Sequence, residues 1–342
     1  MSLATTVLDE YRLGLERSNL DVAENRMANY GAFDTALRDT PNLVPGYEEV
    51  VRERINADRT SSIVVLQALD FTVGSSRSCT APTADSTSAY VTPSWTTIET
   101  GFQMNKARNL ANQVKYQQEF NHKMKHLERA FLGTLDTAVI THLEANKTTT
   151  NAADDNPFNF TSNSMVVPLA DHDTFFNEVD QIYMQNDFPA GAMKNVVASP
   201  RLSSIIRYYA NQGAANSANY AFQFADFNFG YTNNISVTAT NDIGILYTMP
   251  VGTLGRLTWI DPDCRIGSSI GEEKQWFTQM LPQLGVEVGV YYQKACYDYS
   301  GTITGAERSM FEYYEFSLDY SVISSYISSG AKPIFKANFQ SV

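Results

Sequence analysis

Apolar residues recur every three or four positions between residues 104 and 145, which is the spacing of one face of an α-helix. Within this segment glycine occurs only at Gly133, and proline is absent. The pattern predicts an amphipathic helix of about 40 residues, roughly 60 Å long if unbroken, that ends before the polar run starting at Lys147. The apolar positions are Leu110, Val114, Phe120, Met124, Leu127, Phe131, Leu135, Val139 and Leu143.

The segment before this helix is rich in β-branched and aromatic residues. Two runs, Ile63–Val73 and Ala89–Phe102, have the composition of strands, and a long Ser/Thr-rich stretch separates them. We expect a β-hairpin with a protruding polar tip. Because an isolated two-stranded ribbon is only marginally stable in water, we expect it to pack on another subunit.

Residues 1–60 lack the apolar density of a domain and contain no lysine, only arginine, as basic residues. A short helical pattern (Val7, Tyr11, Leu15) begins near Thr5 or Thr6. Arginine forms bidentate pairs with carboxylates, so the segment is suited to an arm that lies on a partner's surface. A solvated terminus is the alternative.

Residues 171–284 indicate a mixed α/β domain. Asp171 or Asp173 can cap a helix that ends before Phe188, and Pro200 begins a second helix. Strands are expected at 195–198, at 222–229, at 235–238 and at 243–247.

Two longer strands follow residue 285. Apolar residues alternate from Val286 to Tyr292 and again from Phe316 to Val322, which is the two-residue period of half-buried strands. No internal repeat is visible.

Composition narrows the possible functions. The 342 residues are 43% hydrophobic and 12% aromatic, too apolar for a disordered chain. The net charge of -12 argues against a free-standing nucleic-acid binder and against an anionic membrane surface. No signal peptide or membrane span is apparent, and Cys79, Cys264 and Cys296 form no CxxC pair. We expect a soluble protein made in a reducing cytoplasm.

The motifs that suggest catalysis or metal binding have simpler explanations. Gly267–Gly271 matches G-x-S-x-G, but no histidine follows Ser269, so a glycine-serine turn is expected instead of a nucleophile elbow. His122 and His126 lack the glutamate of H-E-x-x-H and have lysine neighbours. The acidic clusters at 154–156 and 261–263 lack the spacing of a calcium loop and suit turns. We therefore predict no catalytic residue, cofactor or metal site.

One part of the chain is basic. Residues 104–131 contain six lysines and arginines against two glutamates, a net charge of 6 − 2 = +4. The predicted helix therefore has a basic stripe within an acidic chain.

The chain therefore has a definite order of parts: an arm, a polar-tipped hairpin, a long helix, an α/β region and two long strands. This order resembles the major capsid protein of tailed double-stranded DNA bacteriophages, an α+β fold shared with encapsulins and the herpesvirus capsid floor. The resemblance covers nearly the whole chain, with local support from the segments 188–200 and 285–296.

The resemblance implies five parts: an N-terminal arm (1–60), an extended loop (61–103), a peripheral domain with a spine helix (104–170), an axial domain (171–284) and return strands of the peripheral domain (285–342). It implies a structural protein, not an enzyme, that assembles as pentamers and hexamers into an icosahedral virion shell around packaged DNA. Assembly in the bacterial cytoplasm with portal, scaffolding and decoration proteins is implied too, without a membrane partner.

The resemblance also assigns roles to particular residues. Residues that face interior DNA would be Lys106, Lys115, Lys123 and Lys125, with an ordinary solvated helix face as the equal alternative. Inter-subunit contacts of the arm and loop would involve Arg12, Arg17, Arg52, Arg54, Arg77 and Trp95.

Some members of this family join a loop lysine to an asparagine of a neighbouring subunit. Here the first lysine is Lys106, so the loop has no amine to offer and no such crosslink is expected. Cys79 at the loop tip is expected to be a free thiol, with an inter-subunit disulfide as the alternative.

Two other functional classes remain open. An encapsulin has the same fold but encloses an enzyme. A tail-fibre or adhesin protein is also rich in strands and aromatic residues, but it does not need the long amphipathic helix.

Overall fold

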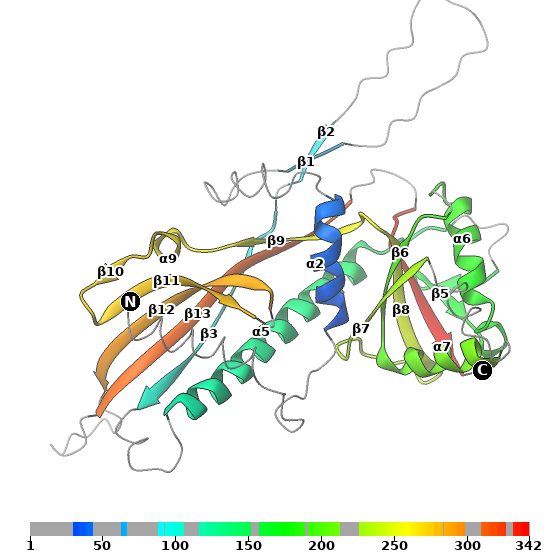
Figure 1. Cartoon of the computed structure of the whole chain (residues 1–342). Helices are drawn as coiled ribbons and strands as arrows, with labels where there is room; N and C mark the ends of the chain where they lie inside the picture. The colour runs from blue at the N-terminus through cyan, green and yellow to red at the C-terminus, as the bar shows by residue number, and fades with distance from the viewer. Residues whose placement is uncertain are drawn as a thin grey trace, which may run out of the picture. The chain divides into compact units, whose positions relative to one another are not determined.

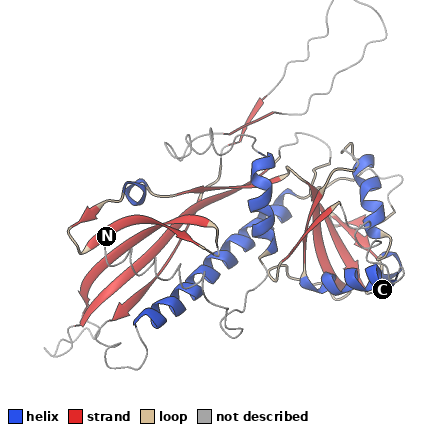
Figure 2. Cartoon of the chain, viewed as in Figure 1, coloured by secondary structure: helices blue, strands red, loops and turns tan. Residues whose placement is uncertain are grey.

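The computed structural model describes residues 30–43, 63–66, 88–91, 93–105, 116–151, 157–188, 191–212, 226–282, 284–297, 309–325 and 331–341. Helices and antiparallel and mixed sheets confirm the predicted α+β class (Figures 1 and 2). The chain divides into two compact units. The first contains residues 95–135 and 258–321, and the second contains 29–94, 136–257 and 322–342.

The first unit is built on an antiparallel sheet with the strand order β10-β11-β12-β13-β3. Strand β9 (Leu254–Trp259) pairs with β13 outside this path, and the short helix α9 (Pro262–Ile266) precedes β10. The other strands are β3 (Thr96–Asn105), β10 (Ser269–Ile270), β11 (Lys274–Leu281), β12 (Val286–Tyr297) and β13 (Ser309–Ser324).

The predicted long helix is confirmed as α5 (Tyr116–Asn146), 31 residues long. Its predicted apolar positions from Phe120 to Leu143 are all buried. At its start, the ring of Phe120 packs edge-on against Phe102 of β3 and Tyr314 of β13, with centroids 5.3 Å apart in both pairs. Met104, expected in the helix, lies in β3, and Leu110 and Val114 lie outside the described residues.

The predicted alternation along the two long strands holds in full for β12, where Val286, Val288, Val290 and Tyr292 are buried. In β13 it holds through Leu318 and then changes phase, so that Ser321 and Ile323 are buried. The pairing of β13 with β12 ends at Ser317, and β9 supplies a different neighbour beyond it. The buried face of β13 therefore changes where its neighbouring strand changes from β12 to β9.

The second unit is built on a mixed sheet with the order β4-β5-β14-β8-β6-β7. Strand β14 runs parallel to β5 and antiparallel to β8, and β6 runs parallel to β7. The strands are β4 (Asn159–Thr161), β5 (Ser164–Val167), β6 (Lys194–Ala198), β7 (Phe227–Tyr231), β8 (Asp242–Pro250) and β14 (Phe335–Gln340). The last of these belongs to this sheet and not to the sheet of β12 and β13, although all three fall within the predicted segment 285–342.

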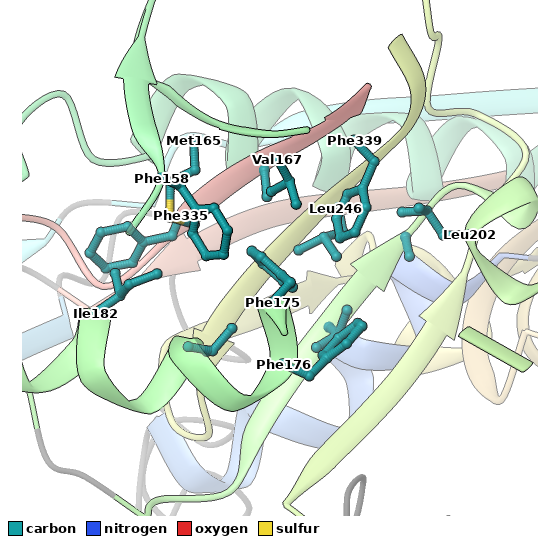
Figure 3. Packing of buried hydrophobic residues seen from close by; sticks show 14 of the residues in the cluster. Phe158, Met165, Val167, Phe175, Phe176, Ile182, Leu202, Leu246, Phe335 and Phe339 are labelled. Atoms are coloured by element: carbon teal, nitrogen blue, oxygen red, sulfur yellow. The ribbon is translucent and has the colours of Figure 1, made fainter. Parts of the chain in front are cut away.

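Two helices cover one face of this sheet. The helices α6 (Phe175–Gln185) and α7 (Pro200–Gln212) bury apolar residues against the sheet in one cluster (Figure 3). Phe175 lies near its centre, 5.0 Å from the ring of Phe339 and 5.2 Å from that of Phe176. Both helices and the buried strand at 195–198 were predicted from the sequence.

The other face of the sheet packs against α2 (Gly31–Leu43) and the C-terminal part of α5. Val197 and Ile245 point to this face, together with Val139 and Leu143 of α5. Neighbouring residues in β6, such as Val196, point to the opposite cluster, as the two-residue period of a strand requires.

Helix α2 shows that residues 30–43 are not part of a surface arm. Ala32, Phe33 and Ala36 are buried, and a Cβ on Gly31 would lie 2.3 Å from the backbone nitrogen of Tyr231. The sequence pattern missed this helix because small residues pack it, and small residues carry little hydrophobic signal.

Three local expectations were wrong. Residues 235–238 form no strand. The N-cap of α6 is Thr174, without a side-chain cap hydrogen bond, while Asp171 ends a 3-10 turn (Leu169–Asp171). The predicted strand 89–102 is divided near Pro93, which has no N–H for a ladder hydrogen bond, so its second part joins the sheet of the first unit.

Candidate assembly surfaces

The predicted hairpin is present as a two-stranded antiparallel ribbon. Strand β1 (Ile63–Leu66) pairs with β2 (Ser88–Val91), from Ile63 opposite Val91 to Leu66 opposite Ser88. No third strand among the described residues joins this sheet. A two-stranded ribbon by itself is only marginally stable in water.

Most of the residues predicted to make inter-subunit contacts lie outside the described part of the chain. These are Arg12, Arg17, Arg52, Arg54 and Arg77, and the thiol of Cys79 is outside it as well. Trp95, which precedes β3, is half-buried, and its Nε1 is enclosed without a hydrogen-bond partner among the described residues. The assignment of these residues to subunit contacts stays a prediction.

Two of the four lysines predicted to face DNA are described. Lys123 pairs with Glu119 at 2.6 Å, and its Nζ donates a hydrogen bond to the carbonyl of Gln103 in β3 at 2.7 Å. Lys125 is half-buried, whereas Lys106 and Lys115 lie outside the described residues. Lys123 thus joins α5 to the edge strand β3 in addition to carrying charge.

The rest of the basic stripe is exposed on α5. His122, His126 and Arg129 are all exposed, while Glu128 is fully buried. The rings of His122 and His126 lie edge-to-face with centroids 4.5 Å apart. Within the described part of the chain no three His, Cys, Asp or Glu residues gather in a way that could hold a metal ion.

Helix α2 is held in the second unit by a buried carboxylate. Asp39, 1% exposed, accepts hydrogen bonds from the backbone N–H groups of Gly252 at 2.6 Å and Leu254 at 2.9 Å. Thr40 accepts one from the N–H of Arg256 at 3.0 Å. The guanidinium of Arg256 also lies over the ring of Phe33, 4.6 Å from its centroid. These contacts join the helix to the β8–β9 turn.

A second buried carboxylate, Asp136, joins three segments that are distant in sequence. It accepts hydrogen bonds from the N–H of Phe33 at 3.0 Å, from the amide of Asn234 at 2.8 Å and from the hydroxyl of Thr232. Asp136 is 0% exposed and lies on α5. Because buried carboxylates are costly unless hydrogen-bonded, this set of donors fixes how α2, α5 and β7 meet.

The first unit has a comparable group around Glu312 of β13. This carboxylate is 4% exposed and accepts hydrogen bonds from the hydroxyls of Tyr292, at 3.2 Å, and Tyr116. Burial, together with neighbouring Tyr314 and Glu312, raises the pKa of Tyr116 well above its ordinary value. The phenol therefore stays protonated and remains a donor.

Two further charged groups join helices to the sheet of the second unit. Lys194, 1% exposed, pairs with Asp180 of α6 and lies over the rings of Tyr183 and Phe227. This pair joins α6 to β6. The second group is centred on Glu144 of α5 and joins that helix to β14.

Glu144 accepts hydrogen bonds from Lys147 at 2.5 Å, Tyr247 at 2.6 Å and Lys336 at 3.1 Å. Burial raises the pKa of Glu144, but the three donors outweigh burial and lower it to about 2. The carboxylate is therefore ionised throughout the physiological range and holds the end of α5 on β8 and β14.

The motifs weighed for chemistry have structural roles. Asp261 caps α9 by accepting from the N–H of Asp263 at 2.8 Å, and Gly267 ends that helix in the left-handed region. Ser269, the serine of G-x-S-x-G, lies in the two-residue strand β10 and not in a strand-to-helix elbow. Cys264 is a buried free thiol, and burial raises its pKa to about 11. Among the described residues no helix is long and apolar enough to cross a membrane.

The buried carboxylates that stabilise each unit internally were not predicted from the sequence. Asp136 and Glu312 have mostly apolar neighbours in their elements, which is a local signal of burial, whereas Asp39 lies between Arg38 and Thr40 and has no such signal. Neither sequence context identifies the distant donors.

No family model and no curated protein matches the chain. Solved structures do match. The chain aligns with a structure of Mycobacterium phage Cain at 14% identity and a TM-score of 0.51, covering 96% of this chain and 97% of that one. A structure of Mycobacterium phage Che8 matches at 11% identity and a TM-score of 0.50, and the alignment covers 94% of each chain. The capsid structure of the cyanophage P-SCSP1u matches at 11% identity and a TM-score of 0.44, and the alignment covers 84% of each chain.

The two Mycobacterium phage structures match over most of the chain, and at these identities the match shows a shared fold. The resemblance inferred from the order of parts is confirmed at the level of fold. The chain has the fold of the major capsid proteins of tailed phages.

Proposed function

We propose that this chain is a structural shell protein that assembles as pentamers and hexamers into an icosahedral capsid around packaged double-stranded DNA. In this proposal the first unit contributes the peripheral domain, with the N-terminal part of α5 as its spine, and the second unit contributes the axial domain. The virion is its destination and the host cytoplasm its place of assembly. Portal, scaffolding and decoration proteins are its further partners.

The observation that carries the proposal is the isolated β1–β2 ribbon in a chain with this fold. Neither strand has a third partner among the described residues, and four residue pairs bury too little to be stable alone. A neighbouring copy would supply the missing contact surface, which makes a single chain incomplete by itself. This is expected of a shell subunit and not of an enzyme.

The basic stripe of α5 supports an interior that faces nucleic acid. Lys123, Lys125 and Arg129 lie on one helix in a chain whose net charge is -12, and Arg129 is exposed. Positive charge confined to one face reduces repulsion from phosphates without giving the whole protein affinity for DNA.

Electron microscopy of the expressed full chain tests the proposal. The chain is produced alone and together with the products of its neighbouring genes, and the high-mass fraction is imaged in negative stain. Closed shells, or hexamers and tubes, are the expected result. A monomer in both preparations would overturn the proposal.

A ribbon variant adds a matched test. Replacing residues 63–91 by a short Gly-Ser linker removes the ribbon and leaves the strands of both six-stranded sheets in the chain. We expect this variant to fold with an unchanged circular dichroism spectrum but to form no closed shells.

A further inference from the structure

The sheet of the first unit has a second face, opposite to the one that packs on α5. Tyr314 points to α5, where its ring meets Phe120, and both residues are fully buried. Residues one position further along each strand point the other way, to what we call the far face. Because β11, β12, β13 and β3 lie side by side, the far face is four strands wide (Figure 1).

Three aromatic residues lie on neighbouring strands of the far face. Trp276 of β11 is paired with Tyr291 of β12, and Tyr313 of β13 is paired with Gln293, two residues beyond Tyr291. Paired residues of an antiparallel sheet, and residues two apart in one strand, point to the same side. All three rings are half-buried, and the centroids of Trp276 and Tyr291 lie 5.0 Å apart. The far face therefore presents aromatic rings across three strands.

The tyrosine rings lie down on the sheet. The hydroxyl of Tyr313 is 3.3 Å from a Cβ built on Gly101 of β3, so this ring leans over a position without a side chain. It donates to Glu315 at 3.3 Å, and the hydroxyl of Tyr291 donates to Gln293 at 2.9 Å. Each acceptor lies two residues along the same strand. The rings are therefore held in place before any ligand binds, which lowers the entropic cost of binding.

Carboxylates and amides border these rings. Glu99 and Gln103 of β3 are exposed, and Glu315 and Gln293 are half-buried. The strand register places Gln103 directly opposite Tyr313. Carboxylate oxygens accept hydrogen bonds, whereas an amide both donates and accepts them. The border can therefore bind a ligand that carries many hydroxyl groups.

Rings and border together suit a neutral carbohydrate. The C–H groups on one side of a pyranose ring carry partial positive charge and pack on the negative face of an aromatic ring. The sugar hydroxyls can then donate to Glu99 and Glu315. Single-stranded nucleic acid also stacks on aromatic rings, but it needs a positively charged groove. The two carboxylates beside the rings disfavour such a polyanion, so the ligand that matches the far face is uncharged.

We propose that Trp276, Tyr291 and Tyr313 form a stacking platform for a neutral polysaccharide chain. Glu99, Gln103, Gln293 and Glu315 are its hydrogen-bonding partners. This inference goes beyond the proposed shell function and does not depend on it, because a single copy carries the whole platform. In an assembly of many copies, weak sites of this kind act together and bind a long polysaccharide more tightly than one site does.

Biolayer interferometry on the purified full chain tests the platform. Sensors are coated with the neutral polysaccharides hydroxyethylcellulose, galactomannan and arabinoxylan, and a further sensor carries the anionic polysaccharide alginate. We expect binding to at least one neutral polysaccharide and none to alginate. Failure to bind all three neutral polymers, or equal binding to alginate, would overturn the inference.

Variants of the platform locate the site. Trp276→Ala and Tyr313→Ala are each expected to weaken binding by about tenfold or more, because a stacking surface is lost. Tyr313→Phe keeps the ring and is expected to keep most of the affinity. The matched control is Tyr208→Ala, which removes a 59% exposed tyrosine from α7 of the second unit and is expected to leave binding unchanged. Circular dichroism checks that each variant folds. Unchanged binding in folded Trp276→Ala, or an equal loss in Tyr208→Ala, would overturn the site.

Electron microscopy of the same variants separates the platform from a contact between copies and from the proposed function. If Trp276→Ala and Tyr313→Ala abolish assembly but leave polysaccharide binding unchanged, a second copy occupies the far face and the inference is overturned. Shells that form normally from variants with tenfold weaker binding would support the platform and leave the proposed function standing. A monomeric chain that binds polysaccharide through these rings would support the platform and overturn the proposed function.

Discussion

The Oδ1 atom of Asp39 lies 2.6 Å from the backbone nitrogen of Gly252, although 213 residues separate the two in sequence. This contact explains how a helix with few large apolar residues stays attached to the second unit. The other carboxylate oxygen binds a second backbone N–H, so one side chain satisfies two buried donors of the β8–β9 turn.

Replacing Asp39 by alanine is therefore expected to destabilise the protein by about 3 kcal/mol, because two buried N–H groups lose a charged acceptor. Asp39→Asn keeps one acceptor oxygen but turns its amide NH2 toward the second N–H donor, so it is expected to cost about as much as the alanine variant. Thermal unfolding followed by circular dichroism measures both changes. The control, Asp34→Ala, changes an exposed acid on the same helix, and an equal loss there would contradict the specific role of Asp39.

The contact between α2 and β7 leaves no space for a side chain. A Cβ at Gly31 would lie 2.3 Å from a backbone atom of β7, and backbone cannot move aside cheaply. Gly31→Ala is expected to cost more than 2 kcal/mol as an overpacked position. Gly267→Ala, which meets nothing within 4 Å but has a positive φ angle, is expected to cost about 1 kcal/mol. Denaturant titration would refute the argument if the two costs were reversed.

His142 makes stability depend on pH. Burial, and then the charge of Lys332, lower the pKa of His142 from 6.5 to about 4. The unfolded chain therefore takes up the proton first as the pH falls. The contribution of neutral His142 to the free energy of unfolding is complete above pH 6.5. It is lost as the pH falls from 6.5 to about 4, and the total loss is up to about 3 kcal/mol.

The variant His142→Gln is expected to flatten the dependence of the unfolding free energy on pH between 6.5 and 4. Urea titrations at intervals of half a pH unit measure this slope for both proteins. The control is His126→Gln, which changes an exposed histidine of the same helix. A similar flattening of the pH dependence in this variant would show that burial of His142 is not the cause.

The phenol of Tyr292 contributes to stability through one buried hydrogen bond to Glu312. Tyr292→Phe is expected to cost about 1.5 kcal/mol, the usual range for a hydrogen bond to a charged group. Tyr291→Phe changes a half-buried neighbour whose hydroxyl donates to Gln293, and is expected to cost less than 1 kcal/mol. Equal losses of unfolding free energy for the two variants in chemical denaturation would show that the hydrogen bond to Glu312 is not the cause.

Shells of this protein are expected to be free of lysine-linked subunits. No lysine precedes Lys106, so the ribbon and its tip have no amine for an isopeptide bond. Boiling purified shells in SDS is expected to release a single band at 38.1 kDa. Resistant ladders whose peptides contain a lysine-to-asparagine link would contradict this expectation.

Elements defined by local periodicity were predictable from the sequence. The apolar face of α5 from Phe120 to Leu143 and the alternation of β12 follow from spacing alone. Pro200 marked the start of α7 because proline suits the first turn of a helix. The overall order of these parts was enough to indicate the fold.

Elements defined by distant partners were not predictable. Helix α2 owes its place to small residues and to Asp39, whose partners lie more than 200 residues away. The sheet membership of β14 depends on a parallel pairing with β5, and nothing in either strand specifies the other. Ile235 is buried without being in a strand, so its apolar character was misread as β structure. Among the candidate assembly surfaces, the sequence indicated the ribbon and the basic stripe.

The position of β14 also has a consequence for biosynthesis. This strand lies inside its sheet, between β5 and β8, and its residues Phe335, Ala337 and Phe339 are fully buried. A ribosome translates residues 335–340 after every other strand of that sheet. Until then the nascent sheet has a gap at its centre and cannot complete its core. Folding of the second unit is therefore completed only after residues 335–340 have left the ribosome, which delays the assembly-competent state until every strand of this sheet is present.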